Sequence, residues 1–177
     1  PSPPRPPQAP PPPPMGSVFE FRFTATRGPE QRGVQIAEVA LYDATGARVT
    51  IVSASNPGGV NPNKAQGAAE AIDGDLATKL YDFGGAGGVW SGAGGGSRPD
   101  VLVTRLVLVL EEYVEVVSYE LWTADDNPPR DPTGWEFGIA RDDDFELLSV
   151  VDGAAPPFGR GEAFGTFFAI HPPSPAP

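Results

Sequence analysis

The segment Val101–Trp135 constrains the fold more strongly than any other part of the chain. It contains the apolar run Leu106–Leu110, which is too short to cross a membrane and rich in β-branched residues, so it predicts a strand covered on both faces. Apolar positions then alternate over residues 114–121 and again from Trp135, which predicts two more strands. The polar segment 125–134 between them, with its prolines and aspartates, predicts a long turn. These elements together favour an antiparallel β-sandwich.

Similar alternation occurs on both sides of this segment. Phe19, Phe21 and Phe23 fall on one face of a predicted first strand, because successive side chains of a strand point in opposite directions. Residues 34–43 predict another strand, whose imperfect spacing suggests a bulge. Further strands are predicted over residues 49–52, 145–151 and 163–170, with a hairpin turn at 43–46 and a helical turn within 65–71.

The chain is predicted to consist of one folded domain between two proline-rich ends. Residues 17–170 form the predicted antiparallel jelly-roll β-sandwich, residues 1–16 a polyproline II arm and residues 171–177 a proline-rich tail. Proline fixes φ and lacks an N–H group, so the arm extends as a rod of about 3.1 Å per residue. The arm acts either as a stiff linker or as a segment that docks on a neighbour. The prolines predicted to carry that interaction are Pro3, Pro4, Pro6, Pro7, Pro10, Pro11, Pro12, Pro13 and Pro14.

Composition excludes several classes of function. Twelve Lys and Arg residues against 23 Asp and Glu residues give a net charge of −11, so the chain lacks the basic face that a nucleic acid requires. No apolar run approaches the length of a membrane span, so no membrane insertion is predicted. There is no cysteine, and the single histidine, His171, opens the proline-rich tail, so neither a thiolate site nor a serine–histidine–aspartate triad is available. The sequence therefore predicts a protein that is not an enzyme.

Three segments, residues 34–49, 71–83 and 119–137, carry a resemblance to a known family. In order and spacing they resemble discoidin-type (coagulation-factor C-type) domains, which belong to the galactose-binding-like jelly-roll sandwiches. The resemblance implies a non-catalytic domain that binds glycans, lipid headgroups or proteins through loops at one end, in many members with a structural calcium ion. The chain departs from the family at Leu80, where relatives commonly have tryptophan, and in its long glycine-rich loop 84–96.

The proline-rich ends resemble in composition the hydroxyproline-rich glycoproteins of plant and green-algal cell walls. This resemblance implies an extracellular protein with hydroxylated and O-glycosylated prolines. No Asn-x-Ser/Thr sequence occurs, because Asn56, Asn61 and Asn127 precede proline and Asn63 has no Ser or Thr two residues later. Any glycan is therefore expected to be O-linked, on hydroxylated proline or on serine.

Asp73, Asp75 and Thr78 surround Gly74 in a short polar segment. Calcium needs roughly six to eight oxygen ligands and a glycine that lets the chain turn tightly, and these three side chains supply several such oxygens. The family resemblance adds a carboxylate from near the C-terminus, where Glu162 stands. The alternative is a turn closed by aspartate side chains without an ion, since Asp-Gly-Asp is an ordinary loop sequence. Both interpretations stay open.

Three residues are candidates for binding a ligand. Tyr81 and Trp90 lie in or beside predicted loops, where an aromatic ring can stack on a sugar. Arg130 lies within the long polar turn, where it can grip a carboxylate or hydroxyl group of a ligand. The alternative is that Arg130 braces its own turn by pairing with Asp126 or Asp131.

Two functions from different classes are expected. The first is a non-catalytic extracellular structural or adhesive module, whose proline-rich ends link or space copies within a glycosylated matrix, wall or surface filament. Its partners are other copies or matrix glycoproteins. The second is a carbohydrate-binding module that targets an attached partner to glycan. A proline arm lying on another copy favours the first, whereas a loop site with exposed aromatic rings and a polar clamp favours the second.

Overall fold

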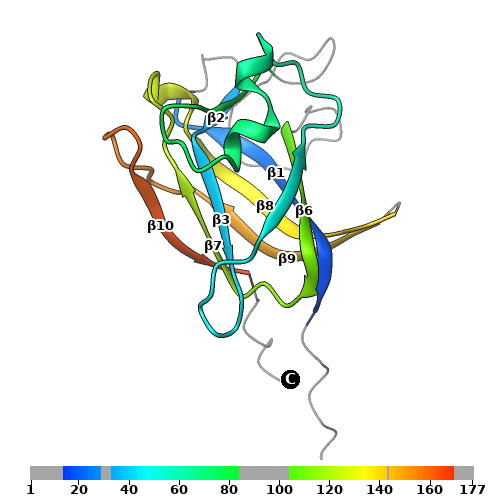
Figure 1. Ribbon diagram of the computed structural model, residues 1–177. Coiled ribbons are helices and arrows are strands. Elements are labelled where there is room, and N and C mark those ends of the chain that lie inside the picture. Colours follow the sequence, from blue (N-terminus) through cyan, green and yellow to red (C-terminus); the bar gives the residue numbers. More distant parts are fainter. Residues whose placement is uncertain (1–13, 29–32, 84–103, 143, 170–177) are drawn as a thin grey trace, which may run out of the picture.

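Ten strands, paired antiparallel throughout, form most of the described structure (Figure 1). The computed structural model describes residues 14–28, 33–83, 104–142 and 144–169, of which 53% lie in strands and 8% in helices. This confirms the predicted all-β antiparallel sandwich. The strands are β1 (Gly16–Thr26), β2 (Val34–Ile36), β3 (Glu38–Tyr42), β4 (Ile51–Ser55), β5 (Leu80–Asp82), β6 (Thr104–Val114), β7 (Ser118–Trp122), β8 (Pro132–Arg141), β9 (Asp144–Asp152) and β10 (Ala163–Phe168).

Helical structure in the described ranges is limited to short 3₁₀ helices. They are η1 (Lys64–Gln66), η2 (Ala68–Ala71) and η3 (Pro128–Arg130). The helical turn predicted within residues 65–71 is therefore present. In the part of the chain that the structure describes, no helix is long and apolar enough to cross a membrane.

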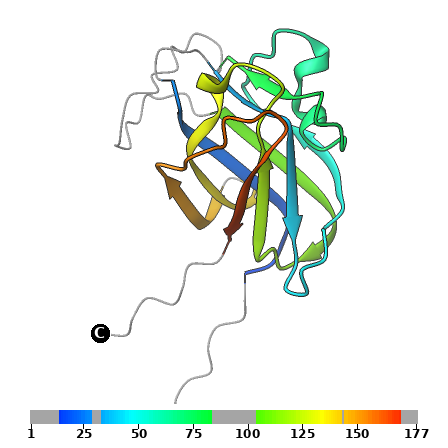
Figure 2. The ribbon, with the colours of Figure 1, turned by 90° about the vertical axis from the view of Figure 1, so that its left-hand side faces the viewer.

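Two sheets face each other across the core. The larger sheet has the strand order β4-β6-β1-β8-β9 and the smaller one the order β10-β7-β3, while β2 and β5 form a separate two-stranded sheet. In Figure 1, β3, β7 and β10 lie in front of β1 and β8, and Figure 2 gives a second view of the two layers. The chain crosses from the larger sheet to the smaller one between β6 and β7 and returns between β7 and β8.

One predicted strand is divided because the chain changes sheets within it. Residues 34–43 form β2 and β3 rather than a single bulged strand. The chain breaks at Ala37, whose N–H donates to the Trp122 carbonyl of β7 (2.9 Å), and β3 then joins the smaller sheet. The predicted turn follows β3, but β4 crosses to the edge of the larger sheet instead of continuing beside β3.

Aromatic side chains join the two sheets. Phe21 of β1 meets Tyr119 of β7 edge to face, with ring centroids 5.1 Å apart, and lies 4.6 Å from the Phe137 ring of β8. Tyr119 is fully buried, so its hydroxyl needs partners: it accepts a hydrogen bond from Trp135 Nε1 (2.9 Å) and lies 3.3 Å from the Ser149 hydroxyl. The predicted placement of three β1 phenylalanines on the core face is confirmed.

The outer face of the larger sheet is only partly covered. In β6, Leu106, Leu108 and Leu110 point into the core, whereas Val107 and Val109 between them point outward and stay partly exposed. The prediction that this strand is covered on both faces is therefore wrong for a single chain. The continuous apolar run arises because the outward positions also carry aliphatic side chains.

A buried carboxylate lies in the middle of this outer face. Glu20 of β1 is 1% exposed and accepts hydrogen bonds from Arg105 Nε (2.6 Å) and Nη2 (2.7 Å) of β6. Arg22 Nε adds a bond of 2.7 Å, and the Arg22 guanidinium lies 3.7 Å from the centre of the Phe145 ring. Burial acts to raise the pKa of Glu20, but the hydrogen bonds from Arg105 and Arg22 outweigh it and lower the pKa below its usual value.

The two ends of the sandwich carry different parts of the chain. At one end, here called the tail end, Gly16 of β1 pairs with Val114, and the Ala169 N–H donates to the Val117 carbonyl (2.9 Å) just after β10. The opposite end, here called the loop end, gathers the segments that follow β1, β4, β7 and β9 (top of Figure 1). The chain therefore enters and leaves the described domain at the same end. Most of the predicted arm (residues 1–16) and all of the tail (residues 171–177) lie outside the described residues.

We expect Glu20→Gln to lower the free energy of unfolding at pH 7 by about 1–3 kcal/mol, because a neutral amide replaces the carboxylate shared by two guanidinium groups. A lowered carboxyl pKa contributes stability above the unfolded-state pKa, near 4.5, and this stability is lost as the pH falls through the folded-state pKa. The difference between wild type and variant should therefore shrink in acid.

Urea unfolding between pH 7 and pH 3 measures this difference. Glu146→Gln, in the exposed pair with Arg141, is the matched control and should have little effect. A Glu20→Gln difference that does not change with pH would contradict the assignment.

Candidate functional site

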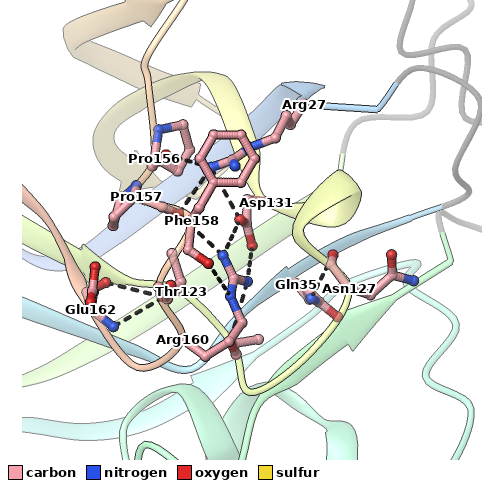
Figure 3. A network of polar contacts seen from close by, with 12 residues as sticks. Arg27, Gln35, Thr123, Asn127, Asp131, Pro156, Pro157, Phe158, Arg160 and Glu162 are labelled. Carbon is pink, nitrogen blue, oxygen red and sulfur yellow. Dashed lines mark hydrogen bonds and ion pairs between the residues drawn. The ribbon is translucent and has the colours of Figure 1, made fainter.

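A network of charged and polar side chains lies at the loop end, around residues 123–131 between β7 and β8 (Figure 3). The turn predicted over residues 125–134 is shorter in the structure, because β8 already begins at Pro132, and η3 lies at its end. Three other parts of the chain hold it: the end of β1, the strands β2 and β5, and the β9–β10 loop. These contacts give a proline-rich turn one defined conformation.

Asp131, at the end of this turn, is fully buried and held by two arginines. Arg160 forms a bidentate pair with it, Nη1 to Oδ1 at 2.9 Å and Nη2 to Oδ2 at 2.8 Å, and Arg27 Nη2 lies 3.4 Å from Oδ2. A planar guanidinium suits such a two-bond pair. Arg160 also donates to four backbone carbonyl oxygens, those of Ala124, Asp126, Pro157 and Phe158.

The surroundings of Asp131 define its role. Burial raises the pKa of the Asp131 carboxyl above its usual value, while Arg160 and Arg27 act in the opposite direction. The same pairing raises the pKa of Arg160. With both oxygens occupied and no exposed surface, Asp131 anchors the turn and is not a group that a substrate can reach.

An exposed aromatic rim stands beside this anchor. Phe158 is 78% exposed, and the Arg27 guanidinium lies 4.1 Å from the centre of its ring. Arg27 also donates to the carbonyl oxygens of Pro156 and Pro157, the latter at 3.0 Å (Figure 3). The rim therefore presents an apolar ring whose position is set by a cation on one face.

The middle of the turn is held from the two-stranded sheet. Lys79, next to β5, is buried, and its Nζ pairs with Asp125 Oδ1 (2.7 Å) and Asp126 Oδ1 (2.6 Å). Gln35 of β2 donates through Nε2 to the carbonyl oxygens of Asp126 (2.5 Å) and Asn127 (3.1 Å). Burial acts to raise the pKa of Asp126, but Lys79 lowers it on balance. These carboxylates are therefore engaged in holding the turn.

Tyr81 and Arg130, two of the predicted ligand-binding residues, are brought into contact with each other. The Arg130 guanidinium lies 4.1 Å from the centre of the Tyr81 ring, and Tyr81 is 4% exposed. With the Asn127 amide turned so that its oxygen faces Arg130, it accepts hydrogen bonds from Nε (2.9 Å) and Nη2 (3.1 Å). A sugar would reach the Tyr81 ring only after Arg130 had moved. Trp90, the third predicted residue, lies outside the described residues.

These contacts agree with the alternative expectation, in which Arg130 braces its own turn. The expected partners, however, are wrong. No ion pair joins Arg130 to Asp126 or Asp131 in the described structure, because Lys79 and Arg160 bind those carboxylates. Arg130 uses an aromatic ring and an amide instead.

Asp73, Asp75 and Thr78, the predicted calcium ligands, lie in one turn that hydrogen bonds close. Asp73 accepts from the Asp75 N–H (2.8 Å) and the Thr78 hydroxyl (2.8 Å), and the Asp75 carboxylate accepts from the Ala77 N–H (2.9 Å). Gly74 has a φ of 79°, a conformation that suits glycine. Among the described residues, no three His, Cys, Asp or Glu side chains are grouped to hold a metal. An ion here would compete with these hydrogen bonds.

Glu162, the fourth predicted ligand, belongs to the network of Figure 3. Its N–H donates to Thr123 Oγ1 (3.0 Å), and its carbonyl accepts from the Thr123 N–H (2.9 Å). Its carboxyl group folds over Gly159, where an added Cβ would lie 2.1 Å from the carboxyl carbon. The β9–β10 loop passes the Asp73–Thr78 turn, since an added Cβ on Gly161 would lie 3.5 Å from Leu76 Cβ. Calcium binding stays a prediction.

A hollow of about 340 Å³ lies beside the same turn, where the chain crosses from β3 to β4. Next to it the buried Glu38 accepts hydrogen bonds from Arg48 Nη2 (3.0 Å) and from the Gly74 N–H (3.2 Å). Burial raises the pKa of Glu38. The walls combine charged groups with aliphatic carbon and are formed by Arg48, Val49, Thr50, Ile51, Ile72, Asp73 and Gly74.

Sequence reasoning did not single out Lys79, Gln35, Arg27 or Arg160. Their partners are far along the chain: 29 residues separate Arg160 from Asp131, and 91 separate Gln35 from Asp126. A glutamine inside the apolar stretch of β2 was a usable signal, because a buried amide requires hydrogen-bond partners. Arg160, in a glycine-rich loop, carried no such signal.

The chain gives no match to a protein family, to a curated protein or to a solved structure. Its function is therefore argued from the contacts described above.

We expect Arg160→Lys to lower the free energy of unfolding by about 2–4 kcal/mol, because lysine cannot form the bidentate pair and leaves Asp131 buried with only the more distant Arg27. Arg141→Lys, in an exposed pair with Glu146, is the matched control and should change stability by less than about 1 kcal/mol. Guanidinium chloride unfolding followed by tryptophan fluorescence measures both. Equal effects of the two variants would show that Asp131 is not an anchor.

Thermal unfolding with and without EDTA tests the calcium prediction. An ion that binds only the folded state raises the melting temperature by mass action. If Asp73, Asp75 and Thr78 bind calcium, EDTA lowers the melting temperature, Asp75→Ala abolishes that response, and Glu162→Gln weakens it. A hydrogen-bonded turn without an ion predicts identical melts in both buffers, and that result would exclude the site.

Proposed function

We propose that the protein is a non-catalytic extracellular module with a structural or adhesive role. In this proposal the proline-rich ends link or space copies within a glycosylated matrix, wall or surface filament. The observation that carries the proposal is the position of the two ends of the described domain, next to the proline-rich segments: Gly16 and Ala169 both lie at the tail end. The full length of the sandwich therefore separates the attachment of the proline-rich segments from the loop end.

The loop end is suited to binding rather than to acid–base chemistry. Asp125, Asp126 and Asp131 are tied to Lys79 or Arg160 and support the backbone of the turn. A glycoside hydrolase, by comparison, needs two carboxyl groups that face a bound substrate. Rigid loops that carry an exposed aromatic ring are a common arrangement for contact with a partner.

The discoidin-type resemblance supports the same proposal. That resemblance implies an antiparallel sandwich with loops at one end that bind a partner. We include jelly-roll connectivity, which the resemblance also implies, in the proposal. We extend the proposal to O-linked glycans on hydroxylated proline or serine, to a structural calcium ion at the Asp73–Thr78 turn, and to other copies or matrix glycoproteins as partners.

The hollow beside β4 favours a second candidate, a carbohydrate-binding module that targets an attached partner to glycan. Arg48 and Asp73 offer a donor and an acceptor for sugar hydroxyl groups, and Ile72 offers apolar contact. The buried ring of Tyr81 weighs against stacking at the loop end. The structural role therefore ranks first.

Deletion of residues 1–13 tests the linking role of the arm. We expect sedimentation velocity to show large assemblies for the full chain and their loss in the deletion variant, because the extended arm no longer reaches a neighbour. A variant with Gly and Ser in place of these residues keeps the length, loses the stiffness and is the matched control. If the shortened chain assembles as readily as the full chain, the linking role is wrong.

A further inference from the structure

The outer face of the larger sheet carries an apolar surface that the described chain leaves open. Leu147 and Val150 of β9 are 48% and 52% exposed, and Val52 of the edge strand β4 is 55% exposed. Partly exposed valines of β1 and β6 continue this surface between the two edges. We call the following six residues the outer patch: Val18, Val52, Val107, Val109, Leu147 and Val150.

Strand pairing places the outer patch on both sides of a charged centre, since Glu20 lies between Val107 of β6 and Gly138 of β8. Val18 of β1 pairs with Val109 of β6. On the other side, Leu147 pairs with Gly138 of β8, and an added Cβ on Gly138 would lie 2.8 Å from the Phe145 ring. The missing side chain at Gly138 leaves room for the Phe145 ring. The patch and its charged centre together form one face, against which another sheet can pack.

We propose that the outer patch is the contact surface between two copies of this chain, packed face to face. Each copy contributes the same surface, so the contact is two-fold symmetric and closes at a dimer. This inference goes beyond the proposed function, since it does not depend on the proline-rich ends. Three observations support it.

The first observation is charge balance. The charged side chains in the middle of this face are two acidic and two basic ones, and the pairing of β1 with β6 and β8 places them together. The chain as a whole has a net charge of −11, so contact through its acidic surfaces meets like-charge repulsion. A balanced face lets two such copies approach. The four residues are Glu20, Arg22, Arg105 and Glu136.

The second observation is size. β1 and β6 are each 11 residues long, which corresponds to about 36 Å, and five strands spaced about 4.8 Å apart span about 19 Å. Such a face has an area of about 700 Å², close to the area of about 800 Å² that each partner buries in a standard stable interface.

The third observation is the apolar run Leu106–Leu110. Continuous apolar runs are typical of strands that are covered on both faces. Within one chain, only the leucine side of this run is covered. A second copy over the valine side would give the strand the environment that its sequence predicts.

Sedimentation equilibrium of the chain without residues 1–13, which lacks the arm and so cannot form arm-linked assemblies, tests the proposal. We expect a monomer–dimer equilibrium that added salt strengthens, because salt screens the repulsion between two acidic copies. Leu147→Glu combined with Val150→Glu should weaken dimerisation at least about tenfold, because each copy then brings new carboxylates to a face that meets itself. The matched control is Val60→Glu combined with Leu76→Glu, two positions of similar exposure at the loop end.

The sites chosen are exposed, and the melting temperature of each variant checks that it folds. A chain without residues 1–13 that stays monomeric at every concentration overturns the proposal. So does a Leu147→Glu, Val150→Glu variant that dimerises as tightly as wild type.

The other candidate for covering the patch is the proline-rich arm, and a label distinguishes it. Because the chain has no cysteine, Ser2→Cys accepts a single spin label. Strong broadening of the Val107 and Val109 methyl signals would assign the patch to the arm and overturn the dimer contact, whereas sharp signals support the dimer contact.

The linking role of the arm and the sheet contact can fail independently. The deletion of residues 1–13 affects only arm-dependent assembly, and the Leu147→Glu, Val150→Glu variant affects only the sheet contact. Failure of one proposal is therefore distinguishable from failure of the other.

Discussion

The packing of Tyr119 between the two sheets is the interaction on which the rest of the structure depends. Its ring packs against Phe21 and Phe137 of the larger sheet, and its hydroxyl group meets Trp135 and Ser149. A buried hydroxyl without partners would cost stability, and here β8 and β9 of the larger sheet supply both partners. Because β7 leads directly into residues 123–131, holding Tyr119 in the core also sets where the loop end begins.

The loop end illustrates how a surface turn becomes rigid. The turn between β7 and β8 has little regular secondary structure of its own to fix its conformation. Contacts with Arg160, Lys79 and Gln35 hold it in one conformation. Its carboxylates Asp125, Asp126 and Asp131 pair with Lys79 or Arg160. The rim around Phe158 lies at this end, whereas the described domain begins and ends at the tail end. The proposed structural or adhesive role rests on this division.

The candidate site shows where sequence reasoning reaches its limit. The Asp73–Thr78 turn could be predicted, because the three hydrogen bonds that its aspartate side chains accept within the turn join residues at most five positions apart. Tyr81 and Arg130 could each be predicted to lie in or beside a loop. The stacking of one on the other could not be predicted, since it depends on how β5 and η3 meet. The anchor at Asp131 could not be predicted, because it joins three segments that only the folded chain brings together.

The sequence by itself determined most of the strands and, for the alternating ones, the side turned to the core, because alternation is a local property of consecutive residues. The phenylalanines of β1 lie where alternation placed them. Only the tertiary structure decided that residues 34–43 divide between two sheets, that Arg160 and not Arg130 binds Asp131, and that the valine face of β6 lies open. Sheet order and buried ion pairs depend on residues far apart in the chain, whose meeting is decided by the packing of the whole core.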